Sequence, residues 1–135
     1  MSQMSDYLEN ALINHLFNKT SYTIPTVYVA LCTSAPTDAD TGTTIASKEP
    51  SGSGYARKST VAGDWNSASG GSITNANTIT FATPTGSWGT LTHFALIDAS
   101  SAGNVLMYGS LTTSQAAGLN NTVSFSAGQL SATFQ

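Results

Sequence analysis

Apolar residues follow two different periods along this chain, and the change from one to the other separates a helix from a run of strands. Leu8, Leu12 and Leu16 recur every four residues, as on one face of an α-helix. Ser5 is a suitable N-cap, and Asp6 places a negative charge in the first turn. We therefore predict a helical arm over residues 1–20 and a β domain over residues 21–135, together forming a single domain.

The predicted helix carries a second apolar face. Ile13 and Phe17 lie about 100° away from the leucine stripe by the helical period. One face can lie on the chain's own domain, so the other needs a second partner. We expect five arm residues to contribute to assembly: Leu8, Leu12, Ile13, Leu16 and Phe17.

Beyond residue 25 the apolar positions alternate with the period of strands. Residues 26–32 are apolar on both faces and predict a central strand, whereas Arg57 and Lys58 place the strand at 54–61 near an edge. Two hairpins are predicted, 90–98 with 104–112 and 121–126 with 129–134, besides short strands at 72–75 and 78–82. About eight short strands predict a mainly β fold, an antiparallel β-sandwich of jelly-roll type with one N-terminal α-helix; a barrel is the alternative. Residues 33–53 are predicted to form a long surface loop.

The composition of the chain indicates which functions are compatible with it. Only 11 of the 135 residues are charged, while 19 Ser and 20 Thr carry hydroxyls. A surface wetted by neutral groups is easily desolvated when another protein docks, and it offers few groups for acid–base chemistry. The four basic residues are too scattered to follow a phosphate backbone, and no apolar run approaches the length of a membrane span. We expect neither nucleic acid nor membrane among the partners.

The residues that could support chemistry each have a structural interpretation. His93 has no partner on its face of a strand, His15 lies on the helix stripe, and Cys32 ends an apolar strand. In the loop, Asp38, Asp40 and Glu49 resemble part of a calcium site, but position 6 of that motif lacks its glycine, which favours a solvated turn. We expect no catalytic residue, no cofactor and no metal, and hence no enzyme.

Aromatic residues outside the helix could stack on sugars, but such residues more often anchor cores or interfaces. The four candidates for such stacking are Tyr55, Trp65, Trp88 and Tyr108. Trp88 is predicted to anchor the loop at 83–89 and is the remaining candidate for an interface.

Three segments carry a resemblance to known proteins: TVYVALCTSAPT at 26–37, GSGYARKST at 52–60, and the long run at 73–112. The chain resembles a tail-fibre-like family of small virion proteins of tailed phages, and also the small β-sandwich cement proteins that stud phage capsids as trimers. The resemblance implies a non-enzymatic virion protein that assembles as a homotrimer and contacts the major capsid protein or other virion proteins.

Between these locations, the sequence favours capsid cement that binds and stabilises the assembled head. A fibre subunit generally needs a long shaft or repeats, and this chain has neither. The alternative is a tail-fibre or tail-associated module that binds a host surface glycan. Exposed aromatic residues flanked by Asn and Asp in loops 33–53 or 62–71 would support that alternative.

Overall fold

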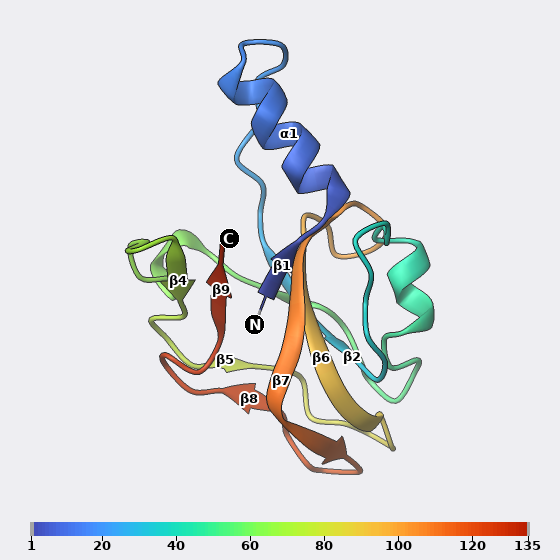
Figure 1. The fold of residues 1–135 in the computed structure, drawn as a ribbon. Coiled ribbons are helices and arrows are strands. Elements are labelled where there is room, and N and C mark those ends of the chain that lie inside the picture. Colours follow the sequence, from blue (N-terminus) through green and yellow to red (C-terminus); the bar gives the residue numbers. More distant parts are fainter. Residues whose placement is uncertain (1, 135) are drawn as a thin grey trace.

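The computed structural model describes residues 2–134, and its centre is a five-stranded antiparallel sheet in the order β1-β7-β6-β2-β3 (Figure 1). Its strands are β1 (Ser2–Met4), β2 (Tyr28–Cys32), β3 (Lys58–Ser59), β6 (Gly89–Ile97) and β7 (Val105–Ala117). Two strand pairs lie outside it, β4 (Ser72–Thr74) with β9 (Ser131–Thr133) and β5 (Ile79–Thr80) with β8 (Ser124–Phe125). The α-helix α1 (Asp6–Leu16) and two 3₁₀ turns, η1 (Thr44–Ser47) and η2 (Ala62–Asp64), complete the described elements. The mainly β, antiparallel, sandwich-like fold with one N-terminal α-helix is confirmed.

Both faces of the central strand β2 are covered, as its apolar pattern predicts. On one face, Val29 pairs with Leu96 and Leu31 with Phe94, and this face belongs to the larger core, which also includes residues of β5 and β9. On the other face, Ala30 and Cys32 belong to a second, smaller core. The sheet is therefore the middle layer, because each face buries its own apolar cluster.

Loop 33–53 supplies the cover for the second face. Ile45, in η1, is fully buried and packs in the same cluster as Ala30 and Cys32. The loop approaches the β6–β7 connection so closely that a Cβ added to Gly42 would overlap the carbonyl oxygen of Ala102. The loop is therefore a structural layer, and not only the solvated surface segment that its polar composition predicts.

The hairpin predicted at 90–98 and 104–112 is confirmed by the antiparallel pairing of β6 with β7. The hairpin predicted at 121–126 and 129–134 is wrong. A turn does occur there, with Gln129 N–H donating to the Ser126 carbonyl, but β8 pairs with β5 and β9 pairs with β4. The side chain of Asn75 lies between the two strands, where its amide bonds the carbonyls of Phe125 and Ser126 and the Leu130 N–H.

The edge position predicted for residues 54–61 is confirmed, although β3 itself is only two residues long. Within residues 2–134, no helix is long and apolar enough to cross a membrane.

Candidate assembly surface

The helical arm begins where its sequence predicts. Ser5 is the N-cap, and its hydroxyl accepts a hydrogen bond from the Leu8 N–H at 3.2 Å. Ser5 is itself fully buried, with its N–H donating to the Leu106 carbonyl at 3.0 Å. This double use of Ser5 fastens the first turn of α1 to β7, and the rest of the helix projects away from the sheet (Figure 1).

After the helix the chain turns back along it. Asn18 adopts a left-handed conformation, with φ of 56°, which ends the helix. His15 Nδ1 then accepts a hydrogen bond from the Tyr22 N–H at 3.1 Å. His15 is exposed, so its role in this chain is to hold the returning segment 20–27 against the helix.

The domain covers only the base of the helix. Leu8 is buried, and Leu12 is partly buried against the main core. Leu16 is 77% exposed, so the leucine face of the helix is covered by the domain at Leu8 and Leu12 only. The helix extends beyond the edge of the sheet (Figure 1), so the sheet does not cover its last turn.

Three large apolar side chains form the end of the arm. Ile13 is 55% exposed and Phe17 is 73% exposed. Leu16 precedes Phe17 directly and lies about one helical turn after Ile13. We call Ile13, Leu16 and Phe17 the arm tip. Their burial by a second partner remains a prediction.

A groove lies beside the base of the arm, between α1, the returning segment, η2 and the β4–β9 pair. Its volume is about 730 Å³. Its lining is entirely uncharged and consists of Leu8, Leu12, Tyr22, Ile24, Pro25, Thr26, Val27, Thr60, Val61, Ala62, Trp65, Asn66, Ile73, Leu96, Leu106, Met107, Ala132 and Phe134. We call this the apolar groove. At its rim Ile24 and Val61 are largely exposed, so the groove adds to the apolar surface of the arm tip.

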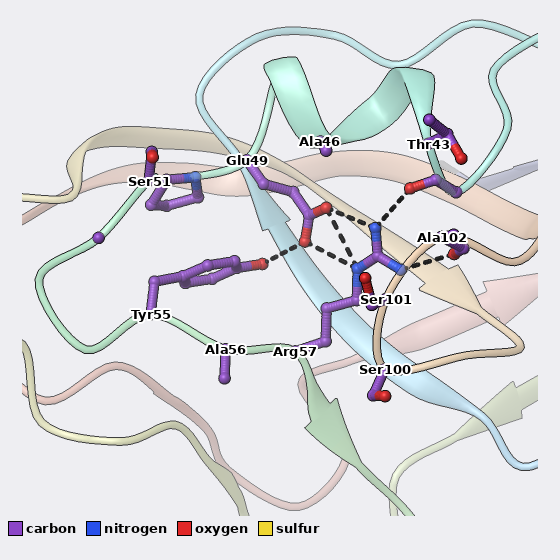
Figure 2. Close-up of a pocket in the computed structure, with 13 residues that line it drawn as sticks. Thr43, Ala46, Glu49, Ser51, Tyr55, Ala56, Arg57, Ser100, Ser101 and Ala102 are labelled. Atoms are coloured by element: carbon purple, nitrogen blue, oxygen red, sulfur yellow. Dashed lines mark hydrogen bonds and ion pairs between the residues drawn. The ribbon is translucent and has the colours of Figure 1, made fainter.

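A second hollow, of about 480 Å³, is lined in part by a buried ion pair (Figure 2). Arg57 Nη2 donates to Glu49 Oε2 at 2.7 Å and to the Gly42 carbonyl at 2.7 Å. Arg57 Nη1 donates to the carbonyls of Ala99 and Ala102 at 3.2 and 2.9 Å. These bonds and those from Nε to Glu49 use all five N–H groups of the guanidinium. Arg57 therefore has no donor left for a ligand, and it fastens three loops together.

The aromatic residues beside this ion pair are structural. Tyr55 Oη donates to Glu49 Oε1 at 2.7 Å and accepts from the Leu31 N–H at 2.9 Å. Burial, together with the Glu49 charge, raises the pKa of Tyr55 above its usual range. The Tyr55 ring packs edge-on against Trp88, whose Nε1 donates to the Ser53 carbonyl at 2.9 Å. Trp88 is 3% exposed, so this interface candidate lies inside the domain, as does Leu8.

The other two aromatic candidates also have partners within the chain. Trp65 is half-buried and its Nε1 donates to Thr60 Oγ1 at 3.0 Å. Tyr108 is buried and its hydroxyl donates to Asp38. Burial, reinforced by this contact, raises the pKa of Tyr108.

The three carboxylates of the calcium-like pattern have different partners. Asp38 accepts from Tyr108, Glu49 pairs with Arg57, and Asp40 pairs with Lys48. Across residues 2–134, no group of three or more His, Cys, Asp or Glu side chains is placed to hold a metal ion. Each carboxylate of the loop therefore makes its own contact within the domain.

His93 and Cys32 also lie in ordinary structural environments. His93 Nδ1 shares a hydrogen bond of 2.8 Å with Thr92 Oγ1, whereas Asp98 accepts from the N–H and the side-chain amide of Asn104. Cys32 is fully buried, and burial raises the pKa of its thiol to about 12. A thiol with that pKa stays protonated at neutral pH and is a poor nucleophile.

Asp40 supplies a pH-dependent contribution to stability. Burial alone would raise its pKa, but hydrogen bonds from Lys48, Thr37 and Thr44 outweigh burial and lower the pKa below 3.8. Because the pKa of Asp40 is lower in the folded state than in the unfolded state, its carboxylate stabilises the fold at pH values above the unfolded-state pKa. This stabilisation is lost as the pH falls through the folded-state pKa. We expect Asp40→Asn to narrow the difference in unfolding free energy between about pH 6 and about pH 3. Urea titrations at both pH values measure it, and an unchanged difference would contradict this assignment.

Sequence reasoning missed three features of this surface: the Glu49–Arg57 pair, the buried Asn75 and the apolar groove. Arg57 is the only arginine of the sequence and lies in a chain with few charges. This scarcity could have indicated that Arg57 forms an ion pair within the fold. The pattern placed it on an exposed edge because its position beside Lys58 is typical of edge strands. The groove had no sign in the sequence, because its lining comes from seven separate segments.

The fold and these surfaces define a small β-rich structural module with a projecting helical arm and few charges. A family model described as podophage GP4 fiber I protein gp80 matches residues 3–133. The chain belongs to this family and is a virion structural protein of the tail-fibre-like type, as the resemblance in its sequence implies. No curated protein matches the chain.

Proposed function

We propose that this chain is a non-enzymatic fibre subunit of a podophage virion and that its helical arm attaches it to neighbouring proteins. The family description supports the fibre role. The observation that carries the attachment role is the arm tip, where three large apolar side chains project into solvent on a well-capped helix. Exposed apolar patches of this kind mark protein contacts in soluble proteins.

The neutral surface supports the same role. Eleven charges, several of them paired within the chain, leave little for long-range electrostatic attraction. Attachment through the arm would therefore rest on apolar packing and neutral hydrogen bonds. Such attachment would depend only weakly on salt, because screening acts mainly on exposed charges.

Capsid cement is the second candidate, and the compact shape of the chain supports it. The described residues form one small body with no shaft (Figure 1), which suits a subunit that binds a lattice of capsid proteins. A glycan-binding role has less support. Loop 33–53 holds no aromatic residue, and Trp65, the aromatic residue of loop 62–71, is half-buried and bonded to Thr60.

The number of copies per virion separates the two candidates. We expect quantitative mass spectrometry, with the major capsid protein as internal standard, to give a handful of copies per particle. Antibody labelling should then mark the tail. Hundreds of copies with label over the head would contradict the fibre proposal and favour cement. In that case particles without the protein should rupture at a lower temperature, because binding only the assembled lattice stabilises it.

A further inference from the structure

The chain contains both a helical apolar tip and an apolar groove that could receive one. Ile13, Leu16 and Phe17 follow the i, i+3, i+4 spacing by which amphipathic helices insert their anchors into grooves. The groove is large enough for several side chains, at about 730 Å³, and its floor is formed by core residues such as Leu96 and Met107.

The tip of one molecule cannot reach the groove of the same molecule. Leu8 and Leu12 of α1 already form one wall of the groove. The remaining residues of the same helix continue away from the sheet (Figure 1), and a helix with its hydrogen bonds intact does not fold back within one turn. An arm tip that docks in the groove therefore comes from another molecule.

Charge limits what that molecule can present. None of the residues lining the groove is charged, so a charged side chain inserted there would lose its hydration without gaining a partner. Between Glu9 and Lys19 the arm carries no Asp, Glu, Lys or Arg. The arm tip thus matches the groove in polarity.

We propose that the arm tip of one copy of this chain docks in the apolar groove of a second copy, beside that copy's own α1. This inference rests on the proposed structural role and identifies the partner of the arm. The tip and the groove are different surfaces. Two copies that exchange tips form a two-fold symmetric pair, whereas a one-way contact runs head-to-tail and closes as a ring or continues as a fibre.

Two variants separate the donor from the acceptor. In the tip variant, Ile13→Ser, Leu16→Ser and Phe17→Ser remove the anchors. In the groove variant, Ile24→Asp and Val61→Asp place charges at the rim. All five positions are more than half exposed, so both variants should fold with unchanged circular dichroism. The matched control is Leu119→Asp, which changes an exposed apolar residue outside both surfaces.

We expect the unaltered chain and the control to self-associate, as measured by light scattering and sedimentation, at concentrations where each variant alone is monomeric. The loss should amount to about 100-fold or more in the dissociation constant, the usual effect of removing central anchors. Mixing the two variants should restore a 1:1 complex, because one intact tip and one intact groove remain. A groove variant that still associates by itself would overturn the proposal, since it would show that tips pack against tips.

Cross-linking gives a second measurement that does not depend on affinity. Cys32 is fully buried, so the thiols introduced by Leu16→Cys in one chain and Ala62→Cys in another are the reactive ones. We expect a disulfide-linked pair only when the two are mixed. A chain that stays monomeric at all concentrations, yet needs its arm tip for incorporation into virions, would overturn the second copy as partner. The virion role of the chain would survive that result, because copy number and location test it separately.

Discussion

Replacing the buried arginine by Arg57→Met should lower the free energy of unfolding by about 3–5 kcal/mol, the usual cost of leaving a buried charge without its partner. The side chains of Arg57 and Glu49 are each only 5% exposed, so water cannot replace the guanidinium around the carboxylate. The carbonyls of Gly42 and Ala102 would lose a donor as well. Domains of this size are usually stable by about 5–15 kcal/mol, so the variant should fold but unfold at a much lower urea concentration.

The controls for this prediction are in the same region of the chain. Lys58→Met removes the neighbouring cation, which is exposed on β3, and should change the stability by no more than about 0.5 kcal/mol. The double change Glu49→Gln with Arg57→Met should cost less than Arg57→Met alone, because no isolated charge remains in the interior. If Arg57→Met behaves like Lys58→Met, the ion pair does not hold the loops together.

The second large effect is expected at Asn75, which is fully buried. Its Nδ2 donates to the carbonyls of Asn77, Phe125 and Ser126, and its Oδ1 accepts from the Leu130 N–H at 2.9 Å. Asn75→Asp keeps the size of the side chain but turns a donor that faces three carbonyl oxygens into an acceptor. We expect a loss of about 3 kcal/mol or more at neutral pH, since each unsatisfied buried group costs about 1–3 kcal/mol.

The pH dependence identifies the cause of this loss. Burial, with three carbonyl oxygens facing one carboxyl oxygen and only the Leu130 N–H donating to the other, would raise the pKa of the new carboxyl in the folded state. A carboxyl with a raised folded-state pKa binds its proton more tightly in the fold, so the penalty should shrink as the pH is lowered from about 8 to about 5. Asn66→Asp is the matched control, because Asn66 is exposed and its amide makes one hydrogen bond, to Thr74. A loss that does not change with pH would contradict the buried-charge explanation.

Asn75 also explains why the last hairpin could not be predicted. The alternation in residues 121–134 identifies strands, and the Ala127–Gly128 turn is local, so both were available from the sequence. Strand pairing could not be predicted, because strands of two or three residues have too few alternating positions to select a partner. The buried amide of Asn75 decides it by holding the β4–β5 junction against the turn between β8 and β9.

The sequence alone determined those elements whose stabilising interactions lie within a few residues of one another. The cap at Ser5, the central strand at 28–32 and the hairpin of β6 and β7 depend on a turn, a cap or a period within a few residues. The low content of charged residues predicts, from composition alone, assembly with other proteins, which stays a prediction. The helix and the strands follow from propensity and patterning, which act over short distances.

Only the tertiary structure decided which residues are covered and which remain exposed. Leu12 and Leu16 have the same place in the helical period, but the sheet lies under the first and stops before the second. Arg57 and Glu49, eight residues apart, meet because loop 33–53 folds over the sheet. The apolar groove exists because segments distant in sequence converge. A one-dimensional pattern shows that a side chain is apolar or charged, whereas burial depends on what the rest of the chain places beside it.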